Sequence, residues 1–549
     1  MAAGREQSIC LAIFLCFTFV YVVVTVANKR KRSLRMPPGP ARLPLLGNAH
    51  RVPSQYQYYT FTTWARKYGE IVYARFFHQN VVILNTLRVA QELMEKRGTI
   101  YSDRPRFVIL AELVRIFHPN YSLMPYGDEW RRQRKWAQTT VQARSTLESY
   151  RPLQQREVRS MLSDLIQAPE NFAEHISKHV DLYVASVLME ILYGITATSS
   201  DGTFIRMSHE TISGTLDLGG AGSSLADLFP ILQYIPSGMP GAGFKRKALK
   251  LRRAAEEVVN LPFERVKTAM SSGTAKTSFV RRILEETSEL ATNVEDERRI
   301  KASAALMYEA MVLYPDVYRK AQIEMDAVVG RSRLPNLDDR LVLPYLECVL
   351  KEVYRYVLAP TRFPSPEFIL NADGLAPGLS ISQNIGQPVQ ILDHETSGLP
   401  HAVLKGDQYR NYLIPGKSIV IANIWAMSRD PEIYTEADAF DNDRFHPSLP
   451  DTDDLTDPRK YIFGFGRRIC PGRFLADSSC WLVAAAMVAA MDISKDRTSS
   501  GDEIDPMESF SPATVRRPNP FVCNIRLRSE KVAQLLSQRD DDGMDRSEA

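Results

Sequence analysis

One ten-residue segment, FGFGRRICPG at positions 463–472, combines a cysteine with glycines, phenylalanines and arginines in an unusual spacing. At background residue frequencies, a Phe-x-x-Gly-x-Arg-x-Cys-x-Gly string is expected in roughly one chain in ten thousand of this length. These residue types suit a cysteine thiolate bound axially to a haem iron. Glycines let the backbone approach a flat macrocycle, and backbone N–H groups near a helix N-terminus favour the ionised thiolate. The segment therefore predicts a haem-thiolate centre with Cys470 as the iron ligand.

The residues around Cys470 have predicted roles of their own. The thiolate would push electron density onto the iron and favour O–O cleavage, which distinguishes a haem that activates oxygen from one that carries it. Arg468 would pair with a haem propionate, and Phe463, Gly466 and Gly472 complete the cofactor-binding loop. The Ala-rich stretch 474–490 predicts a buried helix directly after the loop. For the remaining cysteines of the body we expect the alternative, a small inert hydrophobe: Cys348, Cys480 and Cys523.

Length and composition favour one large globular domain. The 549 residues contain no internal linker rich in Pro, Gly or Ser and no repeat. A hydrophobic fraction of 44% and a net charge of +4 indicate a globular protein with a large core and no strong bias toward nucleic acid. The six cysteines are spaced neither as a disulfide framework nor as a zinc site, which fits a reducing compartment.

The N-terminus predicts a transmembrane anchor over residues 1–28. Its apolar run, 9–27, is broken only by Thr18 and Thr25 and would span about 28 Å as a helix. The Lys and Arg residues that follow place the body of the protein in the cytosol, and residues 29–48 form a basic and proline-rich hinge. A removed signal sequence is the less favoured alternative.

Taken together, these residues resemble the membrane-anchored, microsomal-type cytochrome P450 monooxygenases, and in detail fungal members of the O-methylsterigmatocystin oxidoreductase-like type. The resemblance implies a mainly α fold with a small β-rich subdomain, the cytochrome P450 haem-thiolate fold, with the catalytic domain at 49–530. The acidic residues after it predict a disordered tail at 531–549. The resemblance also implies haem b as cofactor and an endoplasmic reticulum membrane location. NADPH-cytochrome P450 reductase, with cytochrome b5 as a further donor, would supply electrons, because no strand leads into a Gly-x-Gly-x-x-Gly turn.

The resemblance assigns further residues. Glu352 and Arg355 match a pair of helical charges that lock with an arginine from a later loop, here Arg444, as a structural charge cluster. Trp130 and Arg134 match a helix whose side chains, four residues apart, reach a haem propionate; the alternative is a basic surface helix. His401 stands where the family often has a haem or substrate contact, and a buried core histidine is the equal alternative.

Two segments depart from the family pattern. The central helix should carry an Ala/Gly-Gly-x-Asp/Glu-Thr motif whose acid and alcohol relay protons to bound oxygen. Here no Gly occurs between Thr292 and Gly330 and no Thr between Thr292 and Thr361, so the helix is truncated near 309–310 by roughly fifteen residues, about 22 Å. Residues 357–398 form an anomalous insertion without helical or alternating periodicity. A functional lid is one alternative for the insertion. Translated non-coding sequence fits it better, and a matching exon error would explain the missing centre of the helix.

The sequence predicts insertion of one oxygen atom of O₂ into a hydrophobic small molecule of the secondary-metabolite or xenobiotic type. Apolar residues near 101–123, 216–240 and 510–513 would line the substrate pocket. One alternative is a haem-binding but catalytically impaired product, because the oxygen-activating motif is missing and no catalytic acid–Thr pair can be named. Others are a peroxide-dependent thiolate haem enzyme and a membrane-anchored adaptor in which Cys470 is inert.

Overall fold

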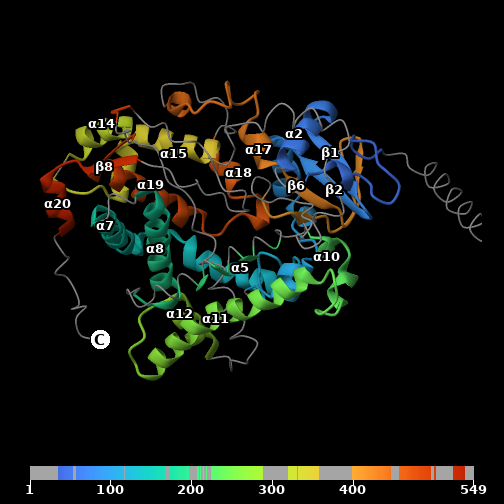
Figure 1. The fold of residues 1–549 in the computed structure, drawn as a ribbon, viewed down its shortest axis with the longest axis horizontal. Helices are drawn as coiled ribbons and strands as arrows, with labels where there is room; N and C mark the ends of the chain where they lie inside the picture. The colour runs from blue at the N-terminus through green and yellow to red at the C-terminus, as the bar shows by residue number, and fades with distance from the viewer. Residues whose placement is uncertain are drawn as a thin grey trace, which may run out of the picture.

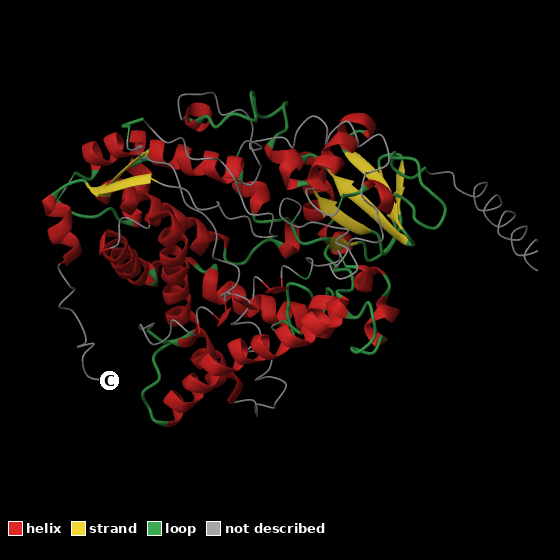
Figure 2. Ribbon diagram, viewed as in Figure 1, coloured by secondary structure: helices red, strands yellow, loops and turns green. Residues whose placement is uncertain are grey.

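In the computed structural model, helices make up most of the chain and the sheets lie mainly at one end (Figures 1 and 2). The structure describes residues 35–53, 57–116, 118–167, 172–196, 224–288, 319–330, 332–357, 398–446, 457–495, 500–502 and 523–537, with scattered positions in 204–218. The predicted anchor 1–28, the truncated central helix at 300–315 and nearly all of the insertion 357–398 lie outside these residues.

The elements follow one another in chain order. The N-terminal half contains α2 (Gln57–Tyr68), β1 (Ile71–Phe76), β2 (Gln79–Leu84), α3 (Leu87–Ala90), η2 (Gln91–Lys96), α4 (Gly98–Tyr101), η3 (Val108–Val114), α5 (Asp128–Val141), α6 (Arg144–Ser149), α7 (Arg151–Gln167), α8 (Phe172–Tyr193), α10 (Leu225–Leu228), η6 (Pro230–Tyr234), α11 (Gly243–Ser271) and α12 (Phe279–Ser288).

The C-terminal half contains α14 (Arg319–Val328), η7 (Leu337–Val342), α15 (Pro344–Val357), β3 (His401–Ala402), β4 (Asp407–Tyr409), β5 (Tyr412–Ile414), β6 (Ile419–Ala422), α17 (Ile424–Ser428), η8 (Asn442–Phe445), α18 (Arg459–Ile462), η9 (Gly466–Arg468), α19 (Arg473–Ala490), β7 (Met491–Lys495), β8 (Cys523–Leu527) and α20 (Glu530–Ser537). The mainly α fold with a small β-rich subdomain is thus confirmed.

The main sheet joins distant parts of the chain in the order β1-β2-β6-β3. β1 and β2 form an antiparallel hairpin, whereas β6 pairs in parallel with β2, with Val82 opposite Val420. Both faces of the sheet are buried, since Val82 packs into one apolar cluster and its neighbours Val81 and Ile83 pack into another. Phe61 of α2 covers the second cluster, so this end of the molecule has its own core.

α19 lies in the larger of the apolar cores. Its apolar sequence follows the Cys470 loop as predicted, and Trp481, Ala485 and Met487 are almost completely buried. α7 and α14 pack against it (Figure 1). Among the described helices, α19 alone is long and apolar enough to cross a membrane, but more than half of it is buried inside the protein. Its apolarity therefore reflects its place in the core.

The described part of the predicted hinge, residues 35–48, is hydrogen-bonded to the main sheet. The N–H of Tyr73 in β1 donates to the Pro38 carbonyl at 2.9 Å, and the Asn48 side chain donates to Pro40 at 3.1 Å. One predicted boundary is wrong. The tail predicted at 531–549 begins with helix α20, in which Val532 and Leu536 are buried. Apolar residues at an i, i+4 spacing explain this helix, which the flanking charges obscured.

Candidate functional site

The Cys470 loop is closed by its own backbone. The Cys470 N–H donates to the Phe463 carbonyl at 2.8 Å, so the segment returns on itself just before α19 begins. Gly464 and Gly466 both have positive φ angles, 78° and 56°. A Cβ on Gly466 would lie 2.1 Å from the Met94 carbonyl oxygen of η2, whereas a Cβ on Gly464 would meet nothing within 4 Å. Gly466 therefore allows the loop to pack closely on η2, whereas the loop has open space beside Gly464.

The sulfur of Cys470 lies in a setting that only partly favours a thiolate. Burial raises the pKa of its thiol, while a hydrogen bond from the Gly472 N–H and the nearby charges of Arg134 and Arg473 act in the opposite direction. The Gly472 N–H fits the predicted backbone support for a thiolate, and desolvation opposes ionisation as the larger effect. A metal cation bound to the sulfur would supply the missing stabilisation.

Arg468 is buried beneath the loop. Its guanidinium donates to three backbone carbonyls, those of Ser102 at 2.8 Å, Tyr121 at 2.9 Å and Met124 at 2.8 Å. It also lies over the Trp130 ring, 4.7 Å from the centroid. Burial lowers the pKa of Arg468 to about 10. Arg468 thus ties the Cys470 loop to residues 102–124, a role that the sequence did not predict, and two of its N–H groups are not needed for these contacts.

Arg134 and Trp130 lie on the buried face of α5. Arg134 is close enough to Cys470 for their charges to interact, and burial lowers the pKa of its guanidinium. Within the described part of the chain, no carboxylate forms an ion pair with Arg134. A basic surface helix is therefore wrong for this face of α5, since both side chains are about 95% buried.

His401 is a buried residue of β3. Its Nδ1 is 2.7 Å from the Tyr101 carbonyl, so Nδ1 carries the hydrogen and Nε2 is the acceptor in the neutral ring. Burial, and then the charge of Arg104, hold the pKa of His401 well below its usual range. Arg104 itself donates to the Leu399 and Pro400 carbonyls at 2.7 and 2.8 Å.

These buried cations fit an anionic group. Arg104, Arg134 and Arg468 are all less than 10% exposed, and burial lowers the pKa of each guanidinium. A buried charge without an ion pair is costly unless a ligand neutralises it. Haem carries two carboxylates as well as an iron that binds thiolate, so the residues present suit this cofactor.

The residues of the predicted charge cluster, Glu352, Arg355 and Arg444, lie together in the structure. Arg355 donates twice to the Glu352 carboxylate, both at 2.6 Å, and Arg444 completes the cluster 3.4 Å from Glu352. Arg355 also donates to the carbonyl of Ser428, the last residue of α17, and to those of Ala437 and Ala439 in the loop after it. The cluster therefore fixes this loop against α15, and the Glu352 and Arg355 side chains have no exposed surface.

Sequence reasoning missed Arg104. It lies in segment 101–123, which we had assigned to the substrate pocket from its apolar residues. The available signal was the basic residues within that stretch, Arg104, Arg106 and Arg115. Arg104 donates to the nearby Ser122 carbonyl at 2.8 Å, but its other two carbonyl partners, Leu399 and Pro400, are almost 300 residues away. No local pattern predicts such a contact.

Comparisons with known proteins place these features in one family. The family model for cytochrome P450 matches residues 37–362 and 392–523. Cytochrome P450 monooxygenase 176 of Postia placenta is 40% identical and covers 96% of both chains. Monooxygenase 136 of the same fungus is 39% identical over 93% of this chain and 92% of its own length. Monooxygenase claR of Ampulloclitocybe clavipes is 33% identical over 94% of this chain and 90% of its own.

Proposed function

The chain belongs to the cytochrome P450 family and is a haem-thiolate monooxygenase that acts on small molecules, and we propose that Cys470 is the axial ligand of haem b. The observation that carries the assignment is the position of Cys470 in a glycine-bent loop beside buried guanidinium groups. When bound, a thiolate-ligated haem activates O₂ and delivers one oxygen atom to a substrate. The balance is RH + O₂ + NADPH + H⁺ to ROH + H₂O + NADP⁺.

Several residues of the chain would bind the haem, each through a different group. Cys470 supplies the ligand sulfur, and the Gly472 N–H donates to it and reduces its negative charge. Arg134, Trp130 and the remaining N–H groups of Arg468 would bind the propionates. His401 would join them only after protonation at Nε2, which a nearby propionate would favour.

A redox partner must deliver the electrons, as cytochrome P450 monooxygenases require. NADPH-cytochrome P450 reductase is the proposed donor, with cytochrome b5 as a second one. A small hydrophobic molecule of the secondary-metabolite or xenobiotic type is the proposed substrate. Buried apolar residues of the expected pocket segment support it: Phe107, Val108, Ile109, Leu110, Leu113, Tyr121 and Leu123.

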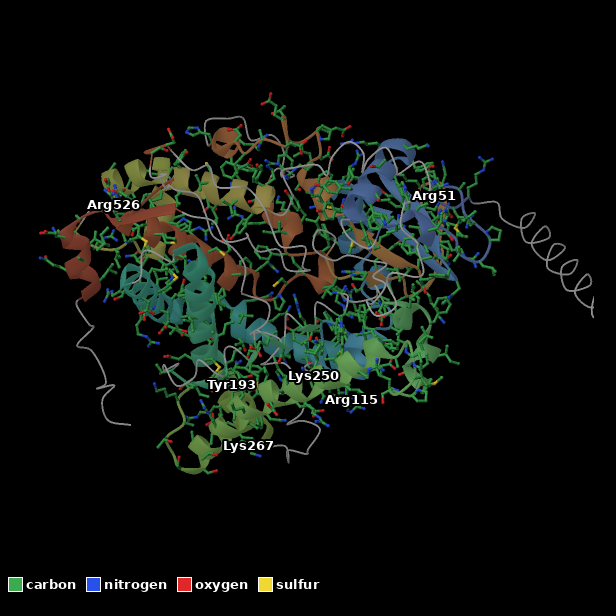
Figure 3. All side chains as sticks on the ribbon, viewed as in Figure 1. Arg51, Arg115, Tyr193, Lys250, Lys267 and Arg526 are labelled. Carbon is green, nitrogen blue, oxygen red and sulfur yellow. The ribbon has the colours of Figure 1, made fainter. Side chains whose placement is uncertain are left out.

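The proposed location is the cytosolic face of the endoplasmic reticulum, with membrane lipid as a partner. Exposed apolar side chains gather in two segments: Leu43, Leu45, Leu46, Ile231, Tyr234 and Met239. The segments adjoin, because the Phe77 N–H donates to Leu46 and the Phe77 ring contacts Phe229 at 5.0 Å. No acidic residue occurs between Asp227 and Glu256, and exposed basic side chains on α11 include Lys250 (Figure 3). Such a surface suits anionic lipid beside a membrane anchor.

We also propose that residues 357–398 are an anomalous insertion and that the central helix is truncated near 309–310. The family model leaves residues 363–391 unmatched, and they lie within the predicted insertion 357–398. The missing acid–Thr pair keeps one rival in view, a product that binds haem but uses NADPH without forming hydroxylated product.

Full-length protein reconstituted with the reductase in lipid vesicles tests the proposal. Isotope-labelled O₂ should place one labelled atom in a hydrophobic product and the other in water, with NADPH consumed in equal amount. NADPH consumption with no labelled product would favour the impaired alternative. Turnover with peroxide and no reductase would favour the peroxide-dependent alternative, and purified protein without haem would favour the adaptor.

A further inference from the structure

Tyr354 connects the two sides of the Cys470 loop. It lies on α15 one residue before Arg355 and is 5% exposed. Its ring meets the Phe463 ring edge to face, with centroids 6.3 Å apart and planes at 71°. Its hydroxyl donates to the Asp477 carboxylate at 3.2 Å. Phe463 precedes Cys470 and Asp477 follows it on α19, so one side chain contacts both flanks of the ligand segment.

The contact with Phe463 reaches Cys470 through the backbone. The Phe463 carbonyl accepts the Cys470 N–H at 2.8 Å, so movement of Phe463 changes the position of the cysteine. An edge-to-face contact of two aromatic rings favours a defined orientation as well as close packing. The Tyr354 ring therefore restricts the start of the loop.

The contact with Asp477 fixes the other flank. The second oxygen of Asp477 pairs with Arg340 at 2.7 Å, and Arg459 lies 3.7 Å from the first oxygen. Arg340 and Arg459 also share Glu347 of α15, at 3.0 and 2.6 Å. The Asp477 carboxylate is thus held in one orientation that presents an acceptor to Tyr354. This orientation fixes the first turns of α19 against α15, and the Gly472 N–H that donates to the Cys470 sulfur lies just before this helix.

The Tyr354 hydroxyl is a neutral donor in this setting. Burial, followed by the nearby Cys480 thiol and Asp477 carboxylate, raises the pKa of the phenol. Burial therefore favours the protonated hydroxyl, which donates to Asp477. The same surroundings raise the pKa of the Cys480 thiol to about 11, mainly through burial.

From these contacts we infer that Tyr354, with Asp477, is a positioning residue that holds Cys470 in its ligand geometry by clamping Phe463 and α19. The inference rests on the proposed role of Cys470 as haem ligand. Tyr354 does not contact the reacting atoms, and it acts through the backbone of the loop. Loss of the clamp should let the cysteine leave the iron more easily while haem remains bound.

The test compares two variants of Tyr354 in haem-loaded, full-length protein. Tyr354→Phe removes the hydroxyl and keeps the ring, whereas Tyr354→Leu removes both contacts. The readout is the rate at which the ferrous CO complex loses its thiolate-type Soret band at fixed pH and temperature. Tyr354→Phe should raise this rate about tenfold, the factor expected when a hydrogen bond to a charged partner is lost. Tyr354→Leu should raise it further.

A double-mutant cycle separates the clamp from general destabilisation. Asp477→Ala should have a larger effect than Tyr354→Phe, because it also removes the ion pairs with Arg340 and Arg459. The double variant should be no worse than Asp477→Ala, because the hydrogen bond from Tyr354 is already lost in that variant. Asp477→Asn keeps an acceptor oxygen and should have the smaller effect. Tyr73→Phe is the matched control, since Tyr73 is a buried residue of the distant main sheet and its hydroxyl donates to Asn80 at 2.6 Å.

The outcomes distinguish this inference from the proposed function. If wild-type protein shows the thiolate-type band but Tyr354→Phe loses it no faster than Tyr73→Phe, the clamp is refuted and Cys470 keeps its role. Additive effects of Tyr354→Phe and Asp477→Ala would also refute the clamp. If wild-type protein lacks the band, or Cys470→Ser leaves it unchanged, the proposed function itself fails and the clamp falls with it.

Discussion

Gly466→Ala offers a direct test of how closely the Cys470 loop must pack on η2. The added Cβ would lie 2.1 Å from the Met94 carbonyl oxygen, 3.0 Å from its carbon and 3.2 Å from the Glu95 Cα. All three are backbone atoms, so the clash cannot be relieved by the movement of a flexible side chain. To reach the 3.0 Å below which real Cβ contacts essentially never occur, the loop or η2 must move by 3.0 − 2.1 = 0.9 Å.

The cost has two parts. At a φ of 56°, the left-handed conformation of an alanine destabilises the folded protein by about 1–2 kcal/mol. The forced backbone shift adds about 1–3 kcal/mol, as overpacking usually does. Gly330→Ala isolates the first part, because Gly330 has a φ of 72° at the end of α14 and a Cβ there would meet nothing within 4 Å.

The assay is a titration of ferric haem into apoprotein, followed by the Soret band, beside urea unfolding of each apoprotein. Gly466→Ala should weaken haem binding by about tenfold or more, because the shift moves a loop that ends at Cys470. Gly330→Ala should lower the stability of the apoprotein by about 1–2 kcal/mol and leave haem affinity unchanged. Equal haem affinity in the two variants would refute the close packing of the loop on η2.

Three further changes test other contacts. Arg355→Ala should lower the free energy of unfolding, measured by urea denaturation, by about 3–5 kcal/mol, because the buried Glu352 carboxylate loses its partner. The control Arg144→Ala, at an exposed ion pair, should lower it by about 0.5 kcal/mol or less. Arg134→Ala should weaken haem binding roughly tenfold, and Arg144→Ala should not, so equal affinities would contradict the propionate role. Removal of residues 530–549 should lower the thermal midpoint, because α20 buries Val532 and Leu536; an unchanged midpoint would contradict the packing of α20.

Local patterns predicted the features that depend on neighbouring residues. The spacing around Cys470 and the apolar run after it predicted a loop followed by a buried helix, and α19 confirms the helix. The i, i+3 pair Glu352 and Arg355 formed as predicted, because a helix brings such residues together.

Long-range contacts could not be predicted. The pairing of residues 100–104 with 401–404, including the N–H of Leu404 donating to Ile100 at 2.9 Å, joins segments that no periodicity relates. Arg104 and Tyr354 owe their roles to such contacts. The burial of Cys470 likewise depends on the whole fold, and it raises the pKa of the thiol more than the local N–H donor lowers it.

The central claim is a bond between the Cys470 sulfur and haem iron, and the ferrous CO spectrum tests it most directly. Wild-type protein loaded with haem should show the thiolate-type Soret band, and Cys470→Ser should lose it while the apoprotein stays folded. An identical band in both proteins would contradict the assignment of Cys470 as the iron ligand.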